Sequence, residues 1–201
     1  MISNENIDGA TPLDPDELSG LKFKHISHRE QLNELEQANI VKGLLWVKKN
    51  NKRDDILTSR FAMDLHKALF KEVWTWAGTY RLTEKNIGID PYRISVSLKN
   101  LLDDLSAWIE FNSYPADEAV LRFHHQLVKI HPFPNGNGRF ARIYADLIAN
   151  KYFHITPINW GGIDLDKITQ TRKNYINALR AADGGDLSVL FTLYGDKAQK
   201  R

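Results

Sequence analysis

Cysteine is absent from the 201-residue chain, and methionine occurs only twice. The lack of cysteine excludes disulfide bonds, thiolate zinc sites and cysteine nucleophiles. Apolar runs are short, and none approaches the roughly 20 residues that a membrane-spanning helix needs. The first residues also lack the basic and apolar regions of a secretory signal. We therefore expect a cytoplasmic protein that has no membrane partner.

Basic residues are missing from positions 1–20, which carry five acidic side chains together with two prolines and two glycines. We interpret this stretch as an extended N-terminal arm, followed by a single domain over residues 21–201. Since the whole chain has a formal net charge of +2, the domain itself is basic and suits an anionic ligand. Its lysines and arginines are scattered among acids, so no direct binding to nucleic acid is expected.

Hydrophobic residues make up 42% of the chain, which is enough for one buried core. Apolar residues recur at steps of three and four, as in amphipathic helices. A segment at 79–97 is instead punctuated by glycine and Asp-Pro, which favours a loop or a small hairpin. We expect an all-α domain, a bundle of about seven helices with a small β-hairpin. The predicted helices cover residues 31–50, 54–78, 97–112, 116–130, 139–153, 166–183 and 186–195.

Between two of these helices lies the sequence HPFPNGNG, residues 131–138. Gly136, Asn137 and Gly138 are the residue types that most readily adopt left-handed backbone angles. They can turn successive N–H groups inward at the start of the next helix, where an anion is favoured. Arg139 and Arg142 follow three residues apart on one helical face. This combination predicts a site for a di- or triphosphate.

His131 stands at the other end of the same loop. Imidazole titrates near neutrality and can accept a proton from a hydroxyl group. A histidine, an anion nest and two arginines within twelve residues indicate nucleotidyl or phosphoryl transfer to a hydroxyl. A glycine-rich turn with surface arginines and a structural histidine is the alternative, and the joint spacing makes it improbable.

Residues 131–142, HPFPNGNGRFAR, resemble the signature of the Fic domain family, HxFx(D/E)GNGRxxR. The resemblance extends to VWTWAGTYR at 73–81, NIGI at 86–89 and YINALRAADGGDLSVLF at 175–191. DGATPLDPDELSGLK at 8–22 and ELEQANI at 34–40 are similar to a bacterial subgroup called mobile mystery protein B. The resemblance covers nearly the whole chain and implies the Fic fold.

Members of the Fic family typically transfer AMP from ATP, with Mg²⁺ or Mn²⁺, to a Ser, Thr or Tyr hydroxyl of a target protein. Some transfer UMP, phosphocholine or a phosphoryl group. The resemblance implies that His131 is the general base and that Phe133 anchors the loop. It also implies an anion hole at Gly136, Asn137 and Gly138, with phosphate contacts from Arg139 and Arg142. The implied flap, which aligns the target peptide by strand addition, includes Asn86, Ile87, Gly88 and Ile94.

Asn135 is the one departure from the signature, because the family has Asp or Glu there as the metal ligand. An amide oxygen can contact Mg²⁺ but brings no negative charge. We therefore expect weaker metal binding, with the phosphates holding more of the ion. The substitution also leaves open a variant donor or an inactive descendant that only binds nucleotide.

Many Fic proteins carry an inhibitory helix with the pattern (S/T)xxxE(G/N), whose glutamate pairs with the second arginine of the signature. In the first long helix Glu36 is the candidate, expected to face Arg142, although Leu32 and Gln37 depart from the pattern. The alternative is a solvated acidic helix face, and Glu34 is the second candidate for the inhibitory residue.

The sequence thus predicts a bacterial, cytoplasmic protein adenylyltransferase that an N-terminal helix inhibits. The resemblance implies a target protein with a reactive hydroxyl as partner, and the similarity to the mobile mystery protein B subgroup implies a small DNA-binding regulator from a neighbouring gene. Two other functions stay open: transfer of another phosphate-linked group, and nucleotide binding without catalysis as a partner of that regulator. His124 and His125 are expected to be structural, and no dedicated zinc site is expected.

Overall fold

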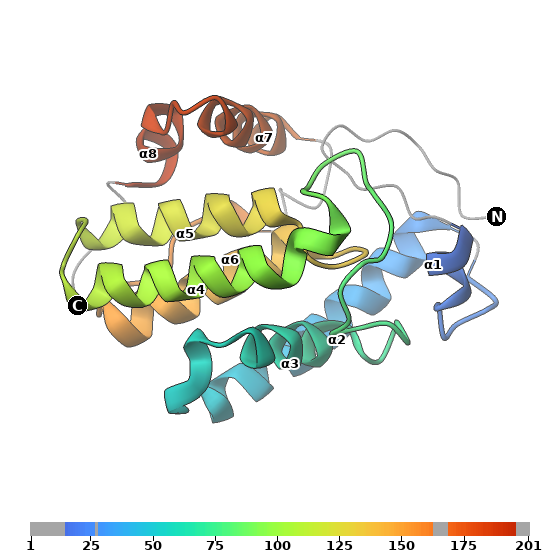
Figure 1. Cartoon of the computed structure of the whole chain (residues 1–201). Helices are drawn as coiled ribbons and strands as arrows, with labels where there is room; N and C mark the ends of the chain where they lie inside the picture. The colour runs from blue at the N-terminus through green and yellow to red at the C-terminus, as the bar shows by residue number, and fades with distance from the viewer. Residues whose placement is uncertain (1–14, 27, 163–168, 196–201) are drawn as a thin grey trace.

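A computed structural model describes residues 15–26, 28–162 and 169–195 (Figure 1). Over these ranges the chain folds into eight α-helices and two short 3₁₀ helices, so the prediction of an all-α fold is confirmed. No helix in the described ranges is long and apolar enough to cross a membrane. The helices are α1 (Pro15–Ser19), α2 (Arg29–Asn50), α3 (Ser59–Phe70), α4 (Ile94–Glu110), α5 (Ala116–Ile130), α6 (Asn137–Tyr152), α7 (Gln170–Asp183) and α8 (Ser188–Tyr194), with η1 (Asp54–Leu57) and η2 (Pro91–Arg93) as the 3₁₀ helices.

Helices α4, α5 and α6 form the middle of the molecule (Figure 1). Helices α7 and α8 pack on α5 at one side, while α2 and α3 lie at the other side, where α3 contacts both α4 and α6. The connection between α5 and α6 is the predicted motif loop. It therefore emerges from the two central helices, which are covered on both sides and hold its two ends in fixed positions.

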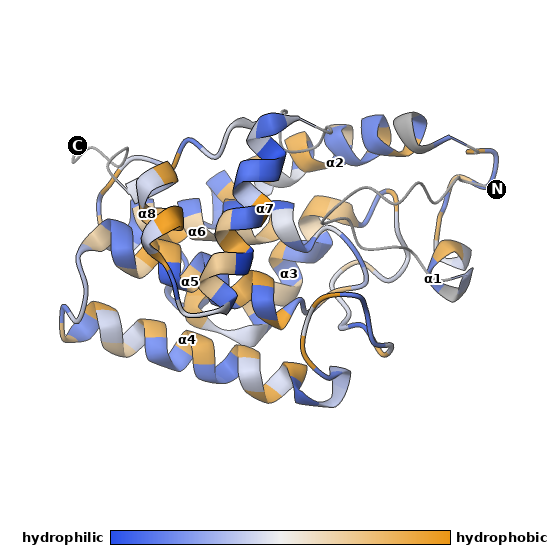
Figure 2. Cartoon of the chain, turned by 90° about the horizontal axis from the view of Figure 1, so that it is seen from above, coloured by the Kyte–Doolittle hydropathy of each residue, from blue (hydrophilic) through white to orange (hydrophobic). Residues whose placement is uncertain are grey.

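Amphipathic sequence explains most of these helices. Along α4 the apolar residues Leu98, Leu101, Leu102 and Leu105 fall on one face and are buried, and Figure 2 shows apolar and polar residues alternating along this helix. Helix α2 differs, because apolar residues occur around its whole circumference. Three of them stay exposed in the described structure: Val41, Leu44 and Leu45.

Two predicted elements differ from the structure at their ends. The predicted helix 54–78 is interrupted at Thr58, whose extended backbone separates η1 from α3 and whose side chain caps α3 by accepting the N–H of Phe61 at 3.1 Å. Residues 71–79 form turns beyond α3. The predicted extended arm is also wrong over Pro15–Ser19, which form α1; Pro15 suits the first helical turn because it needs no N–H partner there. Residues 1–14 lie outside the described part.

The predicted β-hairpin at 79–97 is absent. Residues 80–90 form a loop without paired strands, and Ile94 is the fully buried first residue of α4. The described ranges contain a single isolated β-bridge, between Leu21 and Trp74. The physical reason is the side chain of Arg81, which occupies backbone carbonyl groups of this loop that a strand pair would need.

Candidate active site

His131 ends helix α5 in a left-handed conformation, with φ of 53° and ψ of 61°, and its N–H donates to the carbonyl of Leu127. A residue other than glycine is uncommon there, so the turn aims the imidazole away from the helix axis. Only 4% of the residue is exposed. Burial, followed by the positive charges of Arg81 and Lys85, lowers the pKa of His131 to about 3. The ring is therefore neutral at pH 7, the state in which it can accept a proton.

Arg81 fixes the position of His131, a role that was not identified from the sequence. Its side chain is buried, and its Nε donates to the carbonyl of His131 at 2.7 Å. The same guanidinium donates to the carbonyls of Thr83 and Ile89, so it ties the loop 80–90 to the end of α5. Its backbone N–H donates to the carbonyl of Pro132 at 3.0 Å. A planar group with five donors suits this set of carbonyls.

Phe133 and Asn137 lock the middle of the motif loop. Phe133 is fully buried and stacks on His66 at a ring separation of 3.7 Å, in the anchoring place that the resemblance implied. The side-chain Oδ1 of Asn137 accepts the N–H of Phe133 at 2.9 Å, and its Nδ2 donates to the carbonyl of Phe133 at 2.7 Å. The side-chain amide of Asn137 is thus occupied by the loop itself. Only the backbone N–H of this residue can bind an anion.

Gly136 allows the loop to turn into α6. Its φ is +79°, and a Cβ at this position would lie 2.5 Å from the ring of Phe70, so both backbone and space require glycine. Helix α6 begins at Asn137, and its first intrahelical bond runs from the N–H of Phe140 to the carbonyl of Gly136. The N–H groups of Asn137, Gly138 and Arg139 therefore precede the helical ladder and lie at the positive end of α6.

His66, on α3, contacts the same loop through the carbonyl of Asn135. Its role was not identified from the sequence. Its Nδ1 accepts the N–H of Gly78 at 3.0 Å, and its Nε2 lies 3.0 Å from the carbonyl of Asn135. These partners require Nδ1 to be the acceptor and Nε2 to carry the proton. Complete burial is the main reason why its pKa falls to about 3. A lone histidine on a helix face carries no signal in the sequence that separates this role from ordinary packing.

Asn135 occupies the expected metal position. Its Oδ1 accepts the N–H of Gly136 at 2.6 Å, and its Nδ2 is buried without a hydrogen-bond partner among the described residues. In the same ranges, no group of three or more His, Asp or Glu side chains could hold a metal ion. The described residues therefore fit Mg²⁺ as a counter-ion of bound phosphates and do not fit an ion held by protein carboxylates.

Glu36 reaches the motif from α2, but its partner differs from the expected one. Its Oε2 lies 2.6 Å from Nη2 of Arg139, and the indole N–H of Trp74 donates to its Oε1 at 2.7 Å. The prediction that Glu36 faces Arg142 is wrong, because Glu36 reaches the first turn of α6 at Arg139. Glu36 is 2% exposed, whereas Glu34 is exposed, so Glu36 is not part of a solvated acidic face.

Arg142 lies between the first turn of α6 and α7, and a Cβ at Gly138 would lie 3.5 Å from its Nη1. Its guanidinium lies 5.8 Å from the ring centre of Tyr175 on α7, and the hydroxyl of Tyr175 lies 3.0 Å from Nε2 of His124 on α5. His124 is fully buried, which is the first reason for its pKa of about 3. His125 instead contacts Asp183 at 2.9 Å. Both histidines therefore join α5 to α7.

The four predicted flap residues do not share one surface in the structure. Asn86, Ile87 and Gly88 are exposed in the loop 80–90, whereas Ile94 is buried in α4 and cannot meet a target. Gly88 has φ of +106°, and a Cβ there would lie 2.7 Å from Cβ of His131. The loop therefore runs directly against the predicted general base, as a target-binding segment would have to do.

The fold is that of solved Fic domains. The BepC effector protein of Bartonella tribocorum, with bound AMPPNP, is 17% identical and superposes with a TM-score of 0.69 over 94% of this chain and 100% of that one. An N-terminal Fic domain from Bartonella quintana, with bound ADP, is 17% identical and gives a TM-score of 0.71 over 92% of this chain and 96% of the other. At these identities the likeness establishes the fold alone.

Residues 56–149, just under half of the chain, match the Fic/DOC family. A probable protein adenylyltransferase of Sinorhizobium fredii is 25% identical over 134 residues, which are 63% of this chain and 65% of that protein. The protein adenylyltransferase fic-1 of Caenorhabditis elegans is 30% identical over 118 residues, 55% of this chain. The matched part is only 21% of the nematode protein. The shared region is thus the domain that carries the motif loop.

Proposed function

We propose that this chain is a protein adenylyltransferase, which transfers AMP from ATP to the hydroxyl of a Ser, Thr or Tyr side chain on a target protein. The observation that carries the proposal is the placement of a neutral, buried His131 in one rigid loop with the N-terminus of α6 and Arg139. The names of relatives support this reaction, and the bound AMPPNP and ADP of two solved Fic domains support an adenine nucleotide as donor.

In the proposed reaction the target oxygen attacks the α-phosphorus of ATP, and its proton passes to the imidazole of His131. The bond from the α-phosphorus to the oxygen bridging it to the β-phosphorus breaks, and pyrophosphate leaves. The N–H groups at the start of α6 and the guanidiniums of Arg139 and Arg142 stabilise the phosphate charge. Arg81 contributes by holding His131 and the loop 80–90 in register.

Mg²⁺ or Mn²⁺ enters this proposal with the nucleotide. When bound, the ion neutralises phosphate charge. Asn135 offers it one uncharged oxygen, which already accepts the N–H of Gly136 and keeps a second lone pair. The phosphates therefore supply most of the negative ligands, and we expect weaker dependence on the metal than a carboxylate at this position would give.

Glu36 keeps the described conformation inactive in this proposal. Its carboxylate neutralises Arg139 inside the protein, so that guanidinium is not available to the phosphates of ATP. Movement of α2, or neutralisation of Glu36, would release it. The inhibitory role predicted for Glu36 is thus retained, with Arg139 as the arginine that it withholds.

Asn135 also favours a second candidate function, nucleotide binding without transfer or transfer of another phosphate-linked group. The anion site at α6 does not depend on this residue, so nucleotide could bind even where the chemistry is slow. In that case the DNA-binding regulator predicted for the mobile mystery protein B subgroup would be the natural partner. Both the subgroup and the regulator stay predictions.

Incubation with ATP labelled at either the α- or the γ-phosphate tests the proposal. Wild type, Glu36→Gln, Glu36→Gly and His131→Ala are compared for labelling of the protein itself and of added bacterial lysate. We expect α-label to appear with both Glu36 variants and to be lost when His131→Ala is added to either of them. Glu34→Gln is the matched control, since this exposed glutamate has no place at the motif.

Label arriving only from the γ-position would replace AMP transfer by phosphoryl transfer. Absence of label in every variant, combined with ATP-dependent stabilisation of the fold, would favour the non-catalytic function. Labelling that survives His131→Ala would remove His131 from the reaction.

A further inference from the structure

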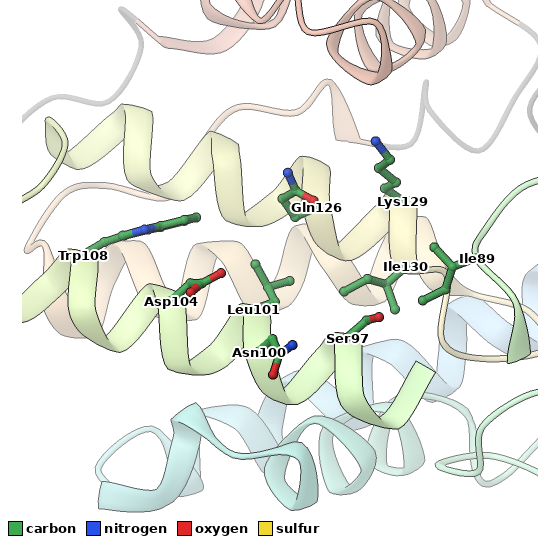
Figure 3. A pocket seen from close by; sticks show the side chains of 9 residues that line it. All are labelled: Ile89, Ser97, Asn100, Leu101, Asp104, Trp108, Gln126, Lys129 and Ile130. Carbon is green, nitrogen blue, oxygen red and sulfur yellow. The ribbon is translucent and has the colours of Figure 1, made fainter. Parts of the chain in front are cut away.

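A groove of about 320 Å³ lies between α4 and α5, on a face that the motif chemistry does not use (Figure 3). Leu101 and Ile130 contribute buried apolar surface to it, and polar side chains stand on both walls. Its lining residues are Ile89, Ser97, Asn100, Leu101, Asp104, Trp108, Gln126, Lys129 and Ile130.

One end of the groove is lined by residues that adjoin His131. Ile130 directly precedes His131 in the sequence, and Ile89 belongs to the loop that runs against His131 (Figure 3). The N–H of Ile89 donates to the carbonyl of Ile130 at 3.5 Å, and Arg81 binds the carbonyls of both Ile89 and His131. A chain whose hydroxyl reaches His131 would therefore pass over this end of the groove.

The groove carries opposite charges on opposite walls. Both line the groove, Lys129 from α5 next to Ile130 and Asp104 from α4 between Leu101 and Trp108, and the Lys129 side chain projects from α5 away from α4 (Figure 3). Among the described residues neither charge takes part in an ion pair of 4.0 Å or less, whereas Asp103, beside Asp104, pairs with Lys99. Both charges are exposed to the groove and are available to an occupant of opposite polarity.

The distance between groove residues on α4 gives the length of peptide that the groove can hold. Ser97 lines the end near the loop, and Asp104 follows seven residues later, about 10 Å along a helix that rises 1.5 Å per residue. An extended peptide covers that distance in about three residues. Asp104 and Trp108 are four residues apart and share one helical face, so a carboxylate and an aromatic ring can meet the same cation.

We propose that this groove binds the segment of the target protein next to the modified hydroxyl. Such a segment would be extended and would carry a basic side chain about three residues from the hydroxyl residue, where it meets Asp104 and Trp108. An acidic side chain adjacent to the hydroxyl residue would meet Lys129. The inference rests on the proposed function, because it takes His131 as the place of reaction.

Exposed apolar residues at the active-site end fit the same occupant. Tyr92 in η2 and Val96 in the first turn of α4 are 93% and 64% exposed. Val96 directly precedes the groove residue Ser97, and Tyr92 lies five residues before it, so both lie near the end of the groove that Ser97 lines. A nucleotide fits less well, since its phosphates would meet the carboxylate of Asp104 and gain no helix N-terminus.

Binding of synthetic peptides to the full chain tests the inference without requiring turnover. Nine-residue peptides centred on Ser, Thr or Tyr carry one Lys at each position in turn, with Asp or Ala beside the hydroxyl residue. Binding is followed through the indole NMR signal of Trp108, assigned by comparison with Trp108→Phe. We expect Lys three residues from the hydroxyl to bind about five- to tenfold tighter than Glu at that position.

The double variant Asp104→Lys with Lys129→Glu should reverse this preference, whereas Asp103→Asn, outside the groove, should leave it unchanged. Binding without dependence on charge position, an unreversed preference in the double variant, or a Trp108 signal that responds to ATP and to no peptide would overturn the inference. Charge-dependent peptide binding in a protein that never transfers AMP would keep the groove and reject the proposed function. AMP transfer combined with unselective peptide binding would keep the proposed function and reject the groove as the peptide site.

Discussion

Among single residues, Asn135 separates this chain most clearly from the Fic signature. Its Oδ1 holds the N–H of Gly136, but its Nδ2 is a buried donor without a partner among the described residues. A buried donor of this kind costs free energy. The residue therefore contributes less than it could, both to the stability of the loop and to the charge balance of a bound nucleotide.

Asn135→Asp should raise AMP transfer, by about tenfold or more in a Glu36→Gln background. A carboxylate supplies the charged metal oxygen that is missing, removes the unpartnered donor and adds a negative charge near the N-terminus of α6, where it is favourable. Initial rates of α-label transfer at several Mg²⁺ concentrations measure the effect. A rate that stays unchanged at every concentration would mean that the metal does not contact this position. Thermal unfolding serves as the control, and the melting temperature should stay equal or rise.

At the scale of elements, α2 is held against the motif by a short polar chain from Trp74 through Glu36 to Arg139. Helix α2 also packs extensively on α3 and buries Leu32 and Ile40, while Val41, Leu44 and Leu45 stay exposed. The ion pair between Glu36 and Arg139 adds a link to the first turn of α6.

Glu36→Gln should tighten ATP binding and weaken the ligand-free fold. Loss of the carboxylate leaves the largely buried guanidinium of Arg139 without its counter-charge, at a cost of about 1–3 kcal/mol, and the phosphates of ATP can then replace it. Titration calorimetry gives the affinity, and thermal unfolding with and without ATP gives the stability. Equal affinity in wild type and variant would contradict an inhibitory ion pair. Glu34→Gln should change neither quantity.

The loop 80–90 and the motif loop form a second coupled pair, joined through Arg81. Arg81→Lys should destabilise the fold by about 2–5 kcal/mol, because an ammonium cannot reach the separate carbonyls that the guanidinium binds. Urea unfolding followed by circular dichroism measures the loss. The exposed Arg93, in η2, provides the control as Arg93→Lys. If Arg81→Lys lowers the free energy of unfolding no more than Arg93→Lys does, these hydrogen bonds do not hold the two loops together.

For the whole molecule, the buried titratable groups predict early loss of stability in acid. The pKa values of His66, His124 and His131 are lowered to about 3. The unfolded chain therefore binds their protons below about pH 6.5, while the folded chain does not, and stability falls between pH 6.5 and 3. Asp146, whose pKa is raised to about 6 by burial, acts in the opposite sense between about pH 4 and 6.

The net difference near pH 5 is roughly two protons, so the free energy of unfolding should fall by about 2–3 kcal/mol per pH unit there. Urea unfolding at half-unit pH steps measures this slope. A stability that stays level from pH 7 to 5 would contradict three neutral buried histidines. His125→Asn is the comparison variant, since its partner Asp183 is half exposed and the change leaves the three buried imidazoles in place.

Sequence periodicity was sufficient for the helices and for the place of the motif loop, because both depend on local spacing. It failed for contacts between distant segments. The partner of Glu36 depends on how α2 is placed relative to α6, and the missing hairpin depends on the side chain of Arg81. His66 looks like any histidine on a helix until Gly78 and Asn135 are seen on its two nitrogens. Such contacts arise from tertiary packing and have no local sequence signal.

The most direct test of AMP transfer is the intact mass of the purified protein after incubation with ATP and Mg²⁺. Glu36→Gln should gain the mass of one or more AMP groups, and the double variant Glu36→Gln with His131→Ala should gain none. The account would be contradicted if neither Glu36→Gln nor an added hydroxyl-bearing target gained mass. A gain equal to one phosphate, or an AMP gain that persists without His131, would contradict it as well.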